Sequence, residues 1–94
     1  MSSILSQKDL EAALDFLPGW FIDGDSLKKE FQFESFRQAM SAMIQLSFEA
    51  EEMNHHPEWT NVYNKLIIRL STHDAGGITE NDIELANRIE HILY

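Results

Sequence analysis

The chain has 94 residues, of which 44% are hydrophobic, so we expect a single domain over residues 1–94 with one modest packed core. Sixteen acidic residues against seven basic ones give a formal net charge of −9, which argues against direct binding to nucleic acid or to anionic lipid. The absence of cysteine excludes disulfides, thiol catalysis and cysteine-ligated metal sites.

The sequence also gives expectations about location and assembly. Its first residues lack a basic segment followed by a continuous apolar stretch, and no run is long enough to cross a membrane, so we expect a cytoplasmic protein. A domain of this size buries only a modest share of its surface. Because association would hide more of the apolar area, we also expect a homo-oligomer.

The first third of the chain predicts a helix followed by a β-hairpin. Ser6 and Asp9 resemble a helix-capping pair, and Pro18 ends a helical pattern of about ten residues. The apolar positions of that pattern are Leu10, Ala13, Leu14 and Leu17. Two β-like runs, 20–22 and 27–33, flank the turn-rich residues 23–26 and so predict the hairpin.

A long central helix is predicted over residues 35–53, which contain no glycine or proline. Residues recurring there at helical spacing form one stripe, of the kind that usually faces the core or another copy of the chain. The stripe consists of Phe36, Ala39, Met40, Met43, Ile44 and Ser47. His55, His56 and Pro57 end the helix, because the residue before a proline is pushed toward extended geometry.

Two more strands and a last helix complete the pattern. The runs 59–63 and 66–72 are β-rich, with Asn64 and Lys65 as the expected turn between them. In the second run, alternation predicts a core face and an opposite face, the first formed by Leu66, Ile68, Leu70 and Thr72 and the second by Ile67, Arg69, Ser71 and His73. Thr79 and Asp82 then predict the capped start of the last helix.

The predicted order of elements is therefore α-β-β-α-β-β-α. Such an order is typical of an α+β fold, here a four-stranded antiparallel sheet with three helices packed on one face.

Three of the four histidines lie between Glu51 and His73, at the ends of predicted elements. Imidazole titrates near neutral pH, so a cluster can hold one ring as acid and another as base, which suits eliminations, hydrations and isomerisations. Neighbours in extended backbone point in opposite directions, so within the pair His55 and His56 one can face a pocket while the other supports it. From the residues alone, catalytic and structural roles both stay open.

Metal binding is the main chemical rival. Three histidines, or two with a carboxylate, can bind zinc. The HExxH pattern is absent, however, and adjacent histidines diverge instead of chelating together. We therefore expect no metal site.

The spacing of these residues resembles the signature of the pterin-4a-carbinolamine dehydratases. Glu51 is followed after three residues by His55, His56 and Pro57, after five more by Tyr63, after nine more by His73 and after eight more by Asp82. The similarity continues through Gly19 and Trp20 and covers nearly the whole chain. It implies an enzyme that removes water from 4a-hydroxytetrahydrobiopterin, giving quinonoid dihydrobiopterin in tetrahydrobiopterin recycling, with no cofactor.

The resemblance also implies an assembly and a site. Pairs of subunits would extend the sheet and then pack through helices, giving a homodimer or homotetramer. The catalytic residues implied are His55, His56, His73 and Glu51. His55 and His73 would flank the pterin, while His56 would act as acid or base near the 4a-hydroxyl. Glu51 would orient a histidine, and Asp82 would combine a site role with helix capping. The other substrate-binding positions implied are Asn54, Ser71, Thr72 and Asp74.

Two alternatives remain open at this point. Trp20 and Trp59 can stack on the pterin, although buried tryptophans more often belong to the core. Animal members of the family also serve as dimerisation cofactors of a homeodomain transcription factor. A protein-binding module with a transcription-factor partner is therefore the alternative function.

Overall fold

The computed structural model, which describes residues 3–94, builds one antiparallel sheet from two β-hairpins. The first hairpin joins β1 (Phe21–Asp23) to β2 (Ser26–Gln32), and the second joins β3 (Glu58–Val62) to β4 (Lys65–Leu70). The strand order is β1-β2-β4-β3, so β2 and β4 are central. This order places residues of both hairpins side by side.

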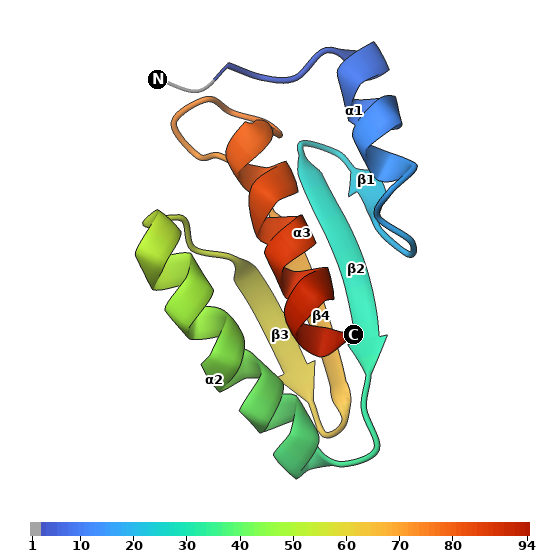
Figure 1. The fold of residues 1–94 in the computed structure, drawn as a ribbon, viewed down its shortest axis with the longest axis vertical. Helices are drawn as coiled ribbons and strands as arrows, with labels where there is room; N and C mark the ends of the chain where they lie inside the picture. Colours follow the sequence, from blue (N-terminus) through green and yellow to red (C-terminus); the bar gives the residue numbers. More distant parts are fainter. Residues whose placement is uncertain (1–2) are drawn as a thin grey trace.

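Three helices accompany the sheet: α1 (Gln7–Leu14), α2 (Phe36–Met53) and α3 (Glu80–Leu93). Figure 1 shows α3 crossing over β4 with α2 beside it, while α1 lies near β1. The α+β fold, its element order and its four-stranded antiparallel sheet are confirmed. None of the described helices is long and apolar enough to cross a membrane.

The core lies between the sheet and the helices. The predicted inner face of β4 is confirmed, because Leu66, Ile68 and Leu70 are buried while residues of the opposite face are only partly covered. Trp20 is buried and donates from Nε1 to Glu90 at 3.2 Å. Trp59 packs against the same core cluster. Trp20 therefore belongs to the core, and Trp59 packs against it from a partly buried position.

Helices α1 and α3 begin at the predicted capping residues, whereas α2 begins at a cap that was not predicted. The Ser35 side chain accepts from the backbone N–H of Gln38 at the start of α2. At the start of α3, Thr79 and Asp82 form the predicted capping box. These local signals hold the two helices that frame the site.

The second hairpin turns one residue earlier than predicted. Val62 pairs with Lys65, so the turn residues are Tyr63 and Asn64 instead of Asn64 and Lys65. Tyr63 adopts a left-handed φ of 52°. The side-chain amide of Asn61 donates to the backbone carbonyls of Tyr63 and Lys65 at 3.1 and 2.8 Å, which stabilises a turn that has no Asn-Gly pair.

The predicted stripe of α2 does not face one way. The buried face of α2 consists of three alanines and one leucine, namely Ala39, Ala42, Leu46 and Ala50. Phe36, Met40 and Ile44 are exposed, together with Phe48, one turn further along the helix. The alanines fit where the helix packs closely, so the larger residues of the predicted stripe point outward.

The strand that carries the third histidine ends earlier than predicted. β4 stops at Leu70, and Thr72 forms only an isolated bridge with Gly77. His73 therefore lies in a turn after the strand instead of at its end. Backbone N–H groups of Ala75 and Gly76 donate to the Thr72 carbonyl and close this turn.

Candidate active site

The junction after α2 separates the two adjacent histidines. Asn54 ends the helix in left-handed conformation, with φ 51° and ψ 44°, and its N–H donates to carbonyls of the last turn. His55 donates its backbone N–H to Ala50 at 3.0 Å, and Pro57 leads into β3. His55 and His56 then bind carboxylates on different elements of the fold.

His55 is bound to a buried carboxylate. Its Nε2 lies 2.5 Å from Oδ1 of Asp82, and the side chains are 12% and 0% exposed. A carboxylate only accepts hydrogen bonds, so Nε2 of His55 carries the hydrogen and Nδ1 is the remaining ring nitrogen. The pair joins the end of α2 to the first turn of α3.

Asp82 also binds the segment that leads to His73. Its Oδ2 accepts from the Thr72 hydroxyl at 2.9 Å and from the backbone N–H of Thr79 at 2.8 Å. The two threonine hydroxyls lie 2.6 Å apart. Asp82 thus contacts a residue directly before His56 and a residue directly before His73, and so fixes both segments.

His56 is bound to an exposed carboxylate. Its Nε2 lies 2.5 Å from Oε1 of Glu51, and the side chains are 56% and 75% exposed. By the same argument Nε2 donates to Glu51, which leaves Nδ1 of His56 free to exchange a proton.

His56 and His73 line one cleft of about 640 Å³, a volume in the range of small-molecule sites. Ser71, which follows β4 directly, and Arg69 on β4 line the same cleft. Seven residues line the cleft: Asp25, Ser26, His56, Glu58, Arg69, Ser71 and His73. The lining is strongly polar.

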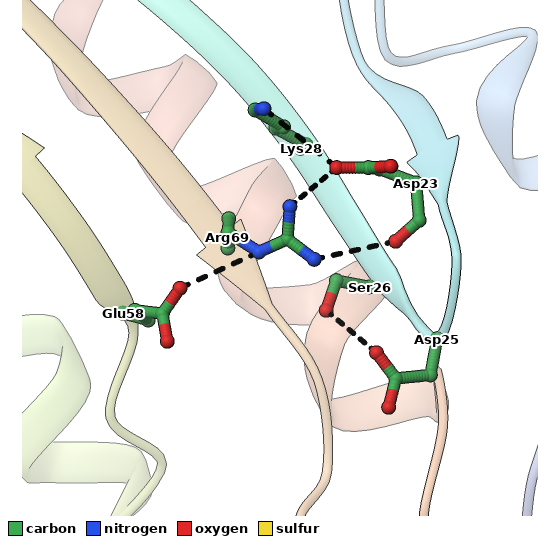
Figure 2. Close-up of polar contacts among 6 residues, drawn as sticks. All are labelled: Asp23, Asp25, Ser26, Lys28, Glu58 and Arg69. Atoms are coloured by element: carbon green, nitrogen blue, oxygen red, sulfur yellow. Dashed lines mark hydrogen bonds and ion pairs between the residues drawn. The ribbon is translucent and has the colours of Figure 1, made fainter.

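A charged network crosses the sheet on one side of this cleft. Figure 2 shows the Arg69 guanidinium on β4 reaching Asp23 on β1 and Glu58 on β3. The distance from Arg69 Nε to Glu58 Oε2 is 3.4 Å, and Lys28 lies 3.6 Å from Asp23. The hydrogen bond with Arg69 lowers the pKa of Asp23, and the same bond raises the pKa of Arg69, so both groups stay charged near neutral pH.

The structure divides the predicted site residues into three sets. His56, Ser71 and His73 line the cleft, with Glu51 bound to His56. His55, Thr72 and Asp82 form the buried network and do not line the cleft. Asn54 and Asp74 are exposed and belong to neither set.

Sequence reasoning missed four residues of the cleft, namely Asp25, Ser26, Glu58 and Arg69. Arg69 had a signal, since it shares its strand face with Ser71 and His73. The other three come from β2, β3 and the turn before β2, and only the strand order brings them there.

The described residues support neither a metal site nor, in the other large hollow, a pair of imidazoles. Within residues 3–94, no group of three or more histidine or acidic side chains is placed to hold a metal ion. Another hollow, of about 740 Å³ between α2 and α3, is lined partly by Arg88 and His91. Arg88 there is bound by Glu49, Glu52 and Glu84, so its charge is already balanced, and the hollow contains one imidazole instead of two.

The fold and the cleft define a small α+β protein with two imidazoles in one polar cleft. Comparison with known proteins shows its family. The family model described as pterin 4 alpha carbinolamine dehydratase matches residues 3–92. A putative pterin-4-alpha-carbinolamine dehydratase of Opitutus terrae is 53% identical over 100% of this chain and 98% of its own length. One of Prochlorococcus marinus is 43% identical over 99% and 98%.

A solved structure is similar as well. The transcriptional coactivator/pterin dehydratase from Brucella melitensis superposes with a TM-score of 0.92 at 37% identity, covering 96% of this chain and 98% of that one. The chain belongs to the pterin 4 alpha carbinolamine dehydratase family, whose members are hydro-lyases.

Proposed function

We propose that this protein removes water from a 4a-hydroxytetrahydropterin and releases the quinonoid dihydropterin, as a step of tetrahydrobiopterin recycling. The observation that carries the proposal is that His56 and His73 line one cleft of suitable volume. Family membership supports the pterin as the substrate class. No metal or organic cofactor takes part in the proposed reaction.

The reaction needs two proton transfers. The C4a–O bond breaks as an acid protonates the hydroxyl, so the oxygen leaves as water. A base takes a proton from a ring nitrogen, and the electron pair of that N–H bond allows the new C=N double bond to form. One imidazole gives a proton and another accepts one, so His56 and His73 are sufficient for both steps.

Glu51 fixes the state of His56 in this proposal. Because the carboxylate accepts from Nε2 at 2.5 Å, proton exchange with the substrate takes place at Nδ1. The ring is half exposed, so it can exchange protons with water between turnovers.

His55 and Asp82 act as positioning residues. His55, which the resemblance places beside the pterin, donates to Asp82 at 2.5 Å and holds the backbone next to His56. Asp82 holds Thr72, the neighbour of His73, in the same way. The two cleft imidazoles are thus fixed relative to each other through one buried carboxylate.

Stopped-flow absorbance tests the proposal with chemically generated 4a-hydroxytetrahydropterin. We expect the purified protein to accelerate its dehydration and His73→Ala to lose about 100-fold of that acceleration. His91→Ala is the matched control, because His91 is exposed on α3 outside the cleft. No acceleration by the folded protein would contradict the proposal.

We further propose that the protein works as a homodimer or homotetramer joined partly through α2. Four large apolar side chains recur every four residues on its exposed face: Phe36, Met40, Ile44 and Phe48. A second copy of the chain would cover them. Light scattering after size exclusion tests this, with Ile44→Glu expected to lower the molar mass and a monomeric wild type contradicting it.

The alternative function is that of a protein-binding module. The Brucella relative is described as a transcriptional coactivator/pterin dehydratase, and the same α2 face would be the contact surface. A wild-type protein that binds a transcription factor while failing to accelerate dehydration would favour this alternative.

A further inference from the structure

Arg69 brings a positive charge to the cleft that is already balanced by carboxylates. Among the described residues that line the cleft, it is the only permanent cation. Its Nη1 binds the Asp23 carboxylate and its Nε lies 3.4 Å from Glu58. Asp25, another residue of the lining, adds a third negative charge nearby. The guanidinium is therefore not a free anion receptor.

The charge balance around the cleft is negative. Asp23, Asp25 and Glu58 carry three negative charges, against two positive charges on Lys28 and Arg69. Glu51, bound to His56, adds a fourth negative charge, which offsets the proton that the proposed reaction places on one cleft imidazole. The whole chain carries a net charge of −9. An anionic group entering here meets carboxylates at short range and a repulsive field at long range.

Hydroxyl groups, in contrast, find partners of both kinds. Arg69 donates hydrogen bonds from Nη1 and Nη2 to Asp23 and forms an ion pair through Nε with Glu58, which leaves at least two of its five N–H donors for a ligand. Glu58 and Asp25 can accept from a hydroxyl that in turn accepts from Arg69. The mixture suits a neutral group that donates and accepts.

We propose that the cleft selects pterins with an uncharged, hydroxylated side chain and discriminates against those with phosphate or carboxylate in its place, with Asp23 and Glu58 as specificity-determining residues. The inference rests on the proposed function, because that function places the pterin in this cleft. It goes beyond it by excluding anionic side chains and by assigning that discrimination to Asp23 and Glu58.

Binding of two stable dihydropterins tests the selectivity without catalysis. We would titrate the protein with 6-hydroxymethyl-7,8-dihydropterin and with its phosphate monoester in a calorimeter. We expect the neutral compound to bind at least about tenfold more tightly at low ionic strength, and the difference to narrow as added salt screens the carboxylates.

The variant Asp23→Asn sharpens the test, since it releases the guanidinium for a ligand anion. We expect the dissociation constant of the phosphate, divided by that of the neutral compound, to fall by at least about threefold because the phosphate binds more tightly. Glu34→Gln is the matched control, because it removes the same charge from an exposed position beyond the other end of β2. For Glu58→Gln we expect the same fall in this ratio of dissociation constants. This second variant keeps the test valid if Asp23→Asn fails to fold.

The outcomes separate this inference from the function beneath it. Equal or tighter binding of the phosphate by a protein that accelerates dehydration would overturn the selectivity and leave the function standing. The same ratio in Glu58→Gln and Glu34→Gln would overturn the specificity role of the carboxylates. Binding of neither compound would overturn the cleft as a pterin site, and the inference with it.

Discussion

The two histidine–carboxylate pairs are alike in distance and different in surroundings. His55 to Asp82 and His56 to Glu51 are both 2.5 Å, but the first pair is 12% and 0% exposed and the second 56% and 75%. The consecutive residues His55 and His56 thus have different roles, because His55 is bound inside the fold and His56 lines the cleft. The comparison teaches that the distance within a pair does not reveal its role, whereas burial does.

The physical reason lies in solvation. Removing one partner of a buried pair leaves an uncompensated polar or charged group, which typically costs about 3–5 kcal/mol. An exposed pair typically contributes only about 0–1 kcal/mol because water screens it. The His55 pair should therefore control stability, and the His56 pair should control chemistry.

The largest effect is expected from Asp82→Ala. The substitution removes the partner of His55, the capping acid of α3 and an acceptor for Thr72, so we expect the free energy of unfolding to fall by about 3 kcal/mol. Urea denaturation measures it. Glu80→Ala, an exposed acid in the same helical turn, is the control, with an expected loss below about 1 kcal/mol. Equal losses in both variants would contradict the special role of the buried carboxylate.

His56→Ala is expected to show the reverse pattern. The dehydration rate should fall by about 100-fold, because an acid–base group is removed from the cleft. The free energy of unfolding should stay within about 0.5 kcal/mol of the wild type, because the side chain is exposed. Stopped-flow absorbance and urea denaturation of the same preparation give both values. A variant that lost stability and kept its rate would reverse our assignment of the two histidines.

A smaller effect is expected from Glu51→Gln. The amide oxygen can still accept from Nε2 of His56, but the negative charge that holds the ring is lost. We expect a reduction in kcat of about threefold with KM little changed, in line with an exposed pair. A loss as large as that of His56→Ala would show that Glu51 itself takes part in proton transfer.

The smallest expected effect is a pH dependence of stability that arises from the Asp23–Arg69 pair. This third pair is partly exposed. The hydrogen bond and charge of Arg69 lower the pKa of Asp23 from its ordinary value of 3.8. Its stabilising contribution is therefore complete above pH 3.8 and is lost as pH falls through the lowered pKa in the folded state. We expect the difference in free energy of unfolding between wild type and Asp23→Asn to shrink as pH falls below 3.8. A difference that grew on acidification would contradict the lowered pKa.

Much of the fold could be predicted because its signals are local. The caps of α1 and α3, the proline after the histidine pair and the alternation along β4 all act within a few residues. One error is local: hydrogen bonds from Asn61 stabilise a turn one residue earlier, without the Asn-Gly pair that would have marked it. Another error depends on tertiary packing, because the alanines of α2 are buried and its larger side chains point outward.

The candidate site was readable in part for the same reason. His55, His56, His73 and Asp82 all belong to the spacing signature, but the contact of His55 with Asp82 spans 27 residues and depends on where α3 begins. Arg69 and Asp23 lie 46 residues apart and meet only because the sheet order puts β1, β2 and β4 side by side. Neither contact has a pattern in the sequence that specifies it.

The most direct test of this division of labour is nuclear magnetic resonance of the four histidine rings during titration with 6-hydroxymethyl-7,8-dihydropterin. Single histidine variants would assign the four signals. Our account predicts large shifts for His56 and His73, a small shift for His55 and none for His91. Shifts largest at His55, or confined to His91, would contradict the assignment of the cleft as the site where the pterin meets its acid and base.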